Sequence, residues 1–199
     1  MKKHICEKTD ALILCGGKAE RFGKEKALLA YNGETFLSRA VQFWNNVETV
    51  SQVFVAVGNK TSDILTIPEG SIPVYDVFPD SGPMAGIHAG LLNSNSEWIY
   101  VSAVDMPMID INCLPPKRDA DAVVFEIEGK VEPLFGLYRY TALPIFDGLL
   151  REGKTKMLMA IRNNLNSEII PLSLEKKCFF ANVNTSEDYT AVLGSERTY

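Results

Sequence analysis

The stretch from Leu14 to Lys26 places two glycines and several cationic side chains directly after an apolar run. Its sequence is Leu-Cys-Gly-Gly-Lys-Ala-Glu-Arg-Phe-Gly-Lys-Glu-Lys. Paired glycines let backbone N–H groups approach a ligand closely, and consecutive N–H groups in such a turn bind anions. Arg21 and Lys26 add a guanidinium and an ammonium, and both groups bind phosphate oxygens. These features favour a triphosphate-binding loop over a basic loop that is merely solvated.

A carboxylate follows an apolar run of strand length. Asp105 comes directly after residues 98–104, Trp-Ile-Tyr-Val-Ser-Ala-Val. Ligands of open parallel sheets bind outside the carboxyl ends of the strands, and a carboxylate there can hold Mg2+ against phosphate oxygens. On its spacing alone, an Asp that only caps the next turn is the commoner outcome.

Two further polar stretches have a structural and a functional interpretation. Asp76 leads into residues 79–87, Pro-Asp-Ser-Gly-Pro-Met-Ala-Gly-Ile, which could serve only as a connection rich in turn formers. Residues 182–188 read Asn-Val-Asn-Thr-Ser-Glu-Asp, and Thr185 or Ser186 would make a good helix N-cap. A role of these asparagines near the active site and a purely structural role both stay open.

Residues 148–155, Gly-Leu-Leu-Arg-Glu-Gly-Lys-Thr, match the P-loop pattern letter for letter. That motif requires a strand before it and a helix after it. Residues 141–151 instead favour a helix because Leu, Arg and Glu are good helix formers, and Gly153 suits the C-cap of that helix. We therefore interpret the match as accidental, which argues against a P-loop ATPase.

Alternating apolar segments predict an α/β fold with a mainly parallel sheet. Continuous apolar runs are typical of strands that are buried on both faces. We expect strands over residues 11–15, 53–57, 73–75, 98–104, 122–126, 131–138 and 167–172. We expect helices over residues 34–47, 85–92, 141–151, 156–162 and 187–193. Since the sequence has no linker, repeat or low-complexity stretch, we expect one domain over residues 1–199.

The bulk composition excludes several classes of protein. With 46% apolar and 23% charged residues, the chain is an ordinary globular sequence. Its net charge of -5 argues against a dedicated nucleic-acid binder, which would be basic. The four cysteines and two histidines are too scattered for a zinc site and suit reduced thiols in the cytosol. Since neither an export signal nor a membrane-length segment is present, we expect a cytoplasmic protein.

The loop after the first expected strand resembles the signature of the small nucleotidyltransferases, Leu-Ala-(Ala/Gly)-Gly, three residues, Arg-Met-Gly, a short gap and a Lys. Gly16 and Gly17 resemble the guanylyltransferase branch of that superfamily, the molybdenum cofactor guanylyltransferases of the MobA type. The related cytidylyltransferases tend to have Ala-Ala-Gly at these positions. Cys15, Phe22 and Glu25 stand where the family usually has Ala, Met and Asp.

The other polar stretches resemble the same family. Asp76 with residues 79–87 resembles its Asp followed by Gly-Pro-Leu-Ala-Gly, with Met84 in place of Leu. Asp105 and Pro107 resemble its Asp-x-Pro metal site. Residues 182–188 resemble its closing Asn-Val-Asn-Thr-Pro-Glu, with Ser in place of Pro. The family's Asn near the end of the second strand has no clear counterpart, because that column falls on Val57 or, shifted by two, on Asn59.

The resemblance implies a fold like that of the nucleotide-diphospho-sugar transferases, a Rossmann-like three-layer sandwich with a mostly parallel sheet. Residues of about 10–108 would bind the nucleotide, and residues of about 109–199 would bind the acceptor. It implies transfer of GMP from GTP to molybdenum-molybdopterin, which forms the guanine dinucleotide cofactor and pyrophosphate with the help of Mg2+. Cofactor-biosynthesis proteins or molybdoenzyme chaperones are the implied protein partners. We expect a monomer that binds neither nucleic acid nor a membrane.

The family's functional residues carry over to matching positions of this sequence. The implied catalytic residues are Lys26, Arg21 and Asp105, with Asp105 also holding the metal. The implied nucleotide-binding residues are Leu14, Cys15, Gly16, Gly17, Lys26, Asp76 and Asp105. The implied acceptor-binding residues are Asn182, Asn184, Lys154 and Lys156. A cytidylyltransferase with molybdopterin or another phosphorylated acceptor is the alternative within the enzyme class. A nucleotide-binding regulator without turnover is the alternative outside it.

Overall fold

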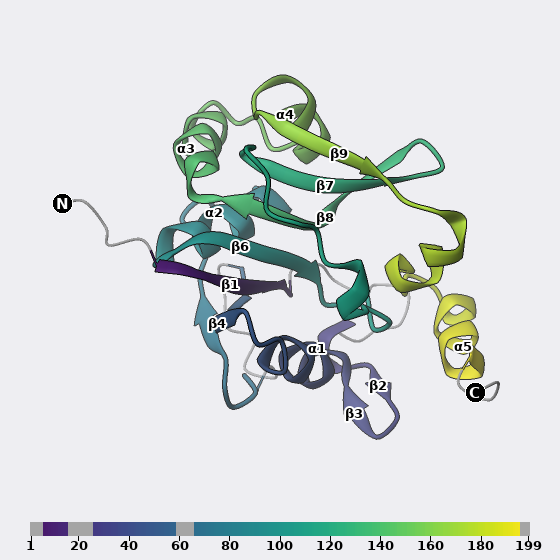
Figure 1. Cartoon of the computed structure of the whole chain (residues 1–199). Coiled ribbons are helices and arrows are strands. Elements are labelled where there is room, and N and C mark those ends of the chain that lie inside the picture. The colour runs from purple at the N-terminus through teal and green to yellow at the C-terminus, as the bar shows by residue number, and fades with distance from the viewer. Residues whose placement is uncertain (1–5, 16–25, 59–65, 196–199) are drawn as a thin grey trace.

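The computed structural model describes residues 6–15, 26–58 and 66–195, which fold around a seven-stranded mixed sheet (Figure 1). The strands lie in the order β5-β4-β1-β6-β8-β7-β9. Only β8 runs antiparallel to its neighbours, so the sheet is mostly parallel as the sequence predicts. The strands span Cys6–Leu14 (β1), Val50–Ala56 (β4), Ile72–Val74 (β5), Ser96–Ala103 (β6), Ala122–Ile127 (β7), Lys130–Arg139 (β8) and Ser167–Pro171 (β9).

Helices cover both faces of this sheet and make a three-layer sandwich. One face carries α1 together with the C-terminal η5 and α5, and the other face carries α2, α3 and α4 (Figure 1). The α-helices span Phe36–Asn45 (α1), Pro83–Asn93 (α2), Leu143–Arg151 (α3), Met157–Asn163 (α4) and Ser186–Ser195 (α5). The 3-10 helices span Lys26–Leu28 (η2), Ile111–Cys113 (η3), Tyr140–Ala142 (η4) and Leu174–Phe180 (η5).

The central strand β1 is buried on both faces, which explains its continuous apolar run. Ala11 and Ile13 pack into the core under α1, whereas Leu12 and Leu14 pack under α2. All four side chains are at most 7% exposed. Each methylene removed from water contributes about 0.8 kcal/mol, so this strand anchors both layers of the fold.

The sequence missed the polar ends of some elements. β1 begins at Cys6, before the apolar run starts, because its polar residues also pair with β6. The buried Asp10 there accepts a hydrogen bond from the Ser94 hydroxyl at 2.6 Å. A short hairpin of β2 (Ala30–Tyr31) and β3 (Glu34–Thr35) precedes α1 and was not expected. α1 therefore starts two residues later than predicted.

The P-loop-like segment has the predicted non-P-loop structure. Gly148 lies inside α3, so no strand leads into the motif. Gly153 has a φ of +71° and donates its N–H to the carbonyl of Leu150 at 3.0 Å after the helix ends. This is the left-handed C-cap that glycine favours, and the prediction of an accidental match is confirmed.

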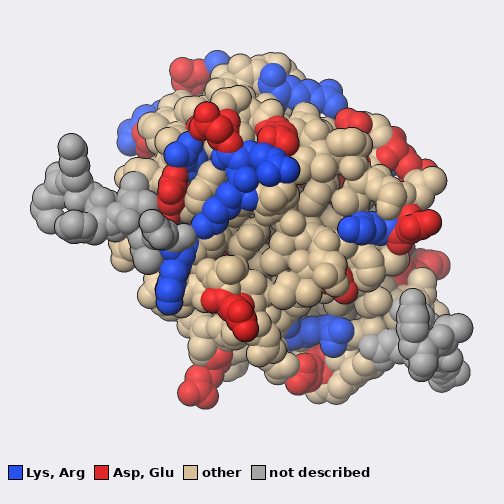
Figure 2. Space-filling model, in the orientation of Figure 1, with Lys and Arg blue, Asp and Glu red and all other residues tan. Residues whose placement is uncertain are grey.

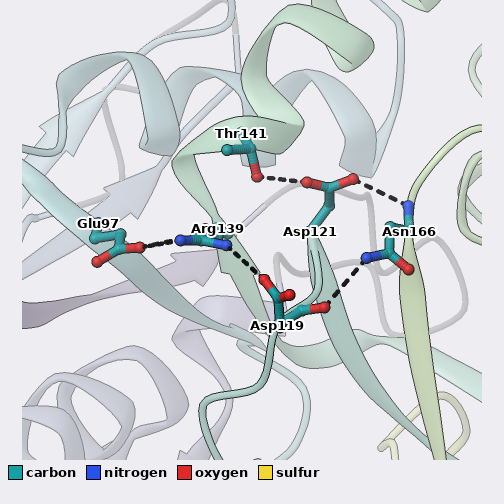
Figure 3. A network of polar contacts seen from close by, with 6 residues as sticks. All are labelled: Glu97, Asp119, Asp121, Arg139, Thr141 and Asn166. Atoms are coloured by element: carbon teal, nitrogen blue, oxygen red, sulfur yellow. Dashed lines mark hydrogen bonds and ion pairs between the residues drawn. The ribbon is translucent and has the colours of Figure 1, made fainter.

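A polar network ties four strands together at the edge of the sheet where the parallel strands begin (Figure 3). Arg139 of β8 bonds Glu97 of β6 at 2.7 Å and reaches Asp119 at 3.3 Å. Asp121, just before β7, accepts from the Thr141 hydroxyl and from a backbone N–H just before β9. The network lies at the edge opposite to the ends of β1, β4 and β6.

The outer surface mixes charges of both signs. On the face seen in Figure 2, lysine and arginine side chains alternate with aspartate and glutamate, and several are in contact. Exposed pairs such as Arg118–Glu168, at 3.3 Å, contribute little to stability. No helix among the described residues is long and apolar enough to cross a bilayer.

Candidate nucleotide-binding site

A cavity of about 400 Å³ opens at the carboxyl ends of β1, β4 and β6. Ligands are expected at this edge of a parallel sheet. The cavity brings together residues that are far apart in the sequence, among them four of the predicted site residues. Its lining residues are Leu14, Lys26, Ala56, Gly58, Asp76, Asp80, Gly82, Pro83, Gly86, Ala103, Val104, Asp105 and Leu134.

Lys26 and Asp105 form an ion pair at one end of this cavity. The Lys26 Nζ lies 2.5 Å from Oδ2 of Asp105, and the two side chains are only 18% and 16% exposed. The same ammonium donates to Oδ1 of Asn184 at 2.5 Å. A cation is thus held between a carboxylate and an amide oxygen, and both of these groups could also face a metal ion or a phosphate ligand.

The C-terminal segment carries Asn184 to the cavity through several backbone contacts. The N–H of Val183 donates to the carbonyl of Asp105 at 2.9 Å, and the Val183 side chain is fully buried. The Asp188 carboxylate accepts from the N–H groups of Asn184 and Thr185, while the Thr185 hydroxyl accepts from the N–H of Asp188 at 3.1 Å. This reciprocal capping confirms Thr185 as the N-cap of α5 and fixes the backbone beside Asn184.

Asp76 presents an unpaired carboxylate oxygen at the other end of the cavity. Its Oδ1 is buried and has no hydrogen-bond partner among the described residues, and burial raises the pKa of this carboxyl. Gly86 lies close by, and a Cβ there would come within 2.8 Å of the Leu14 side chain. A buried acceptor without a donor is costly, so Asp76 is suited to accept hydrogen bonds from a ligand.

The first turn of α2 also faces the cavity. Gly82, the N-cap, has a φ of +66° and provides no side-chain cap, and Pro83 occupies the first turn. A helix N-terminus carries a partial positive charge and free N–H groups. Backbone N–H groups therefore make this end of the cavity polar, although Pro83 and Gly86 contribute no polar side chain.

The residues around Asp105 fit a hard divalent cation whose coordination shell is completed by a bound phosphate ligand and water. Among the described residues, no group of three or more His, Cys, Asp or Glu could form a metal cage. Mg2+ commonly binds through one or two carboxylates together with phosphates and water. Asp105 can supply the carboxylate. In the protein without ligand, this carboxylate already stabilises the positive charge of the Lys26 ammonium.

Other predicted residues lie away from the cavity or engage the sheet. The Leu14 carbonyl accepts from Val104 at 3.1 Å, and the Cys15 N–H donates to Ala56 at 3.0 Å. Leu14 therefore offers the cavity mainly its side chain. Ala56 and Gly58 of the second strand segment line the cavity, but Val57 does not. Gly16, Gly17, Arg21 and Asn59 lie outside the residues that the structure describes.

Lys154 and Lys156 line a second hollow of about 550 Å³ between α2, α3 and α4. Neighbouring residues of α2 line the two cavities, Pro83 the first and Met84 the second. Asn182 borders neither hollow, and its Oδ1 is buried without a hydrogen-bond partner among the described residues. Of the four predicted acceptor residues, the structure thus brings Asn184 to the Lys26–Asp105 pair.

β8 contributes to the cavity, which the apolar pattern did not predict. Leu134 lines it, although the run from Val131 was interpreted as a plain strand. A usable signal was present in Pro133, because proline within a central strand indicates a bulge or an irregularity.

A mostly parallel sheet with helices on both faces and a cavity at the carboxyl ends of its strands define a protein of the open-sheet α/β class. A profile of the MobA-like NTP transferase domain matches residues 11–168. The chain belongs to this family, as the loop after β1 predicts.

Relatives of similar length carry closely related names. The probable molybdenum cofactor guanylyltransferase of Carboxydothermus hydrogenoformans is 32% identical over 190 residues, which cover 91% of this chain and 93% of the relative. The molybdenum cofactor guanylyltransferase of Vibrio atlanticus is 30% identical over 190 residues and covers 92% of this chain and 94% of its own.

Solved structures confirm the predicted fold. The molybdopterin-guanine dinucleotide biosynthesis protein A of Archaeoglobus fulgidus has a TM-score of 0.77 at 21% identity, with 96% of this chain and all of the other covered. The 2-C-methyl-D-erythritol 4-phosphate cytidylyltransferase of Francisella tularensis has a TM-score of 0.68 at 12% identity, with 96% and 100% covered. The same fold therefore occurs in a molybdopterin-guanine dinucleotide biosynthesis protein and in a cytidylyltransferase.

Proposed function

We propose that this protein transfers GMP from GTP to molybdenum-molybdopterin and releases pyrophosphate. The observation that carries the proposal is the Lys26–Asp105–Asn184 cluster at the mouth of a cavity built from β1, β4 and β6. Family membership and the names of the curated relatives support the guanylyl reaction. The acceptor's terminal phosphate oxygen forms a bond to the α-phosphorus, and the bond from that phosphorus to the bridging oxygen breaks. Pyrophosphate leaves with the electron pair.

The chain needs no nucleophile of its own, because the acceptor phosphate is already an anion. Its residues act by positioning and by stabilising charge. Lys26 leaves Asp105 and neutralises charge on the α- and β-phosphates, and Arg21 steadies the pyrophosphate. Asp105 would hold Mg2+, which when bound would supply Lewis-acid stabilisation of negative charge on the phosphates. The positive end of α2 and the Asp76 carboxylate hold the nucleotide at the far end of the cavity.

The acceptor is assigned to the side of Asn184, with Asn182, Lys154 and Lys156 as further contacts. In this proposal, residues of about 10–108 bind the nucleotide and residues of about 109–199 bind the acceptor, within one domain. Asn184 is the best placed of the four, because it already touches Lys26. The cytoplasmic location, the monomeric state and the delivery partners stay predictions.

Isothermal titration with GTP, CTP, UTP and ATP, each with Mg2+, tests the nucleotide half of the proposal. We expect selective binding of GTP that weakens at least tenfold in Asp76→Ala, because the substitution removes the buried acceptor and leaves a donor of the ligand unpaired. Glu168→Ala, on the exposed edge strand β9, is the matched control and should leave affinity unchanged. Selective binding of CTP would move the protein to the cytidylyl alternative, and binding of none of the four would refute the proposed site.

A further inference from the structure

Glu132 lies near the start of β8, close enough to Asp105 for the two charges to interact. The last regular pair between β6 and β8 joins Val101 and Gly136. Since these strands are antiparallel, the segment that follows β6 and carries Asp105 runs towards the start of β8, which carries Glu132. The presence of both Leu134 and Asp105 in the cavity lining agrees with this placement.

A bulge in β8 turns this part of the strand towards the site. Val124 of β7 pairs with Gly136, yet the next residue of β7 pairs with Glu132. Residues 133–135 therefore have no partner on β7, and Leu134 points into the cavity instead. Bulges beside active sites re-aim side chains in this way. Glu132 begins the irregular segment and is fixed on its other side by regular pairing.

The Glu132 carboxylate is half-buried and has no partner among the described residues. Burial raises its pKa, and the negative charge of Asp105 raises it further, although Lys130 opposes the shift. Within the part of the chain that the structure describes, its side chain makes no hydrogen bond and no ion pair. Removing a carboxylate from water without compensation is unfavourable. A donor from a bound ligand would offset that cost.

The order of the strands places Glu132 on the side of the acceptor. Asp76 and Gly86 mark the nucleotide end of the cavity over β4 and β1, and Asp105 follows β6. β8 is the next strand beyond β6, so Glu132 lies on the side of Asp105 that is away from Asp76. Because an anion repels the acceptor's phosphate, Glu132 suits N–H or O–H donors on the rest of that molecule.

We propose that the Glu132 carboxylate accepts hydrogen bonds from ring N–H groups of the acceptor and thereby holds the acceptor's phosphate in line with the α-phosphorus. A reduced pterin offers several N–H donors on one edge, which a carboxylate can accept in pairs. This inference rests on the proposed function, and it assigns a role to a residue that neither the motifs nor the loop signatures contain.

Steady-state kinetics of Glu132→Gln with GTP and molybdenum-molybdopterin test the inference. The variant keeps the size of the side chain and removes an uncompensated charge, so its melting temperature should be at least that of the wild type. We expect kcat/KM for the acceptor to fall about 10- to 100-fold, the range for one charged hydrogen bond. KM for GTP should change less than about twofold. Glu126→Gln, on the neighbouring strand β7, should behave as the wild type.

Three outcomes distinguish a failure of the role proposed for Glu132 from a failure of the proposed reaction. An unchanged kcat/KM for the acceptor in Glu132→Gln would overturn the inference while the wild type still turns over. A loss of Mn2+ affinity in the same variant, as large as in Asp105→Asn and measured by electron paramagnetic resonance, would also overturn it by making Glu132 a metal ligand. No turnover by the wild type would refute the proposed reaction itself.

Discussion

At the scale of single residues, the site is organised around Lys26, whose ammonium occupies the carboxylate that a metal ion would bind. The Lys26 ammonium bonds Asp105 and Asn184, each at 2.5 Å, in the protein without ligand. A metal ion on Asp105 and a phosphate on Lys26 both require this contact to open. Binding of the metal and binding of the nucleotide should therefore favour each other.

Lys26→Met should increase the affinity for Mn2+ in the absence of nucleotide. The substitution removes the cation that neutralises Asp105, so the carboxylate becomes free for a metal ion, and we expect affinity to rise several-fold. Electron paramagnetic resonance of free Mn2+ measures this directly. Lys154→Met is the matched control, because Lys154 pairs with Glu152 outside the cavity. Equal or weaker Mn2+ binding in Lys26→Met would show that the lysine does not compete with the metal.

At the scale of elements, the sequence predicted the regular parts of the fold and missed its irregular parts. The buried strands and the amphipathic α1 follow from apolar spacing, which depends only on neighbouring residues. The bulge in β8 depends on how β7 pairs with it, and a single strand does not encode that register. The polar start of β1 likewise depends on Ser94, which is 84 positions away.

The same limit applies to the candidate site. Glycine, lysine and aspartate motifs identified Lys26, Asp76 and Asp105, because family signatures record local sequence. The contact between Lys26 and Asn184 spans 158 positions and is produced by the docking of the C-terminal segment. Glu132 belongs to no such motif, so only the pairing of the strands reveals its position near the site.

The polar network at the amino-terminal edge should contribute to stability and not to chemistry. Asp121 holds Thr141 and the backbone before β9 (Figure 3). Asp121→Ala leaves these donors without their acceptor, so we expect the free energy of unfolding to fall by about 2 kcal/mol. Urea denaturation measures the change. Glu168→Gln should cost at most about 0.5 kcal/mol, because its ion pair is exposed. A changed KM for GTP in folded Asp121→Ala would contradict this separation.

At the scale of the whole molecule, the sheet divides the work between its strands. β5, β4, β1 and β6 come from the first half of the chain and carry the nucleotide end of the cavity. β8, β7 and β9 come from the second half, and the C-terminal segment returns across the first half to contact Lys26. Tyr189 of α5 also bonds the Ala30 carbonyl and packs on Phe36. The two halves therefore meet at the Lys26–Asp105 pair, where the proposed transfer occurs.

The most direct test of the central claim is a transfer assay with GTP labelled at the α-phosphate and molybdenum-molybdopterin as acceptor. We predict acceptor-dependent formation of the labelled dinucleotide, with GTP preferred to CTP by at least about tenfold, and a loss of about two to four powers of ten in rate for Asp105→Asn. Near-wild-type turnover of Asp105→Asn, or equal use of CTP, would contradict the account.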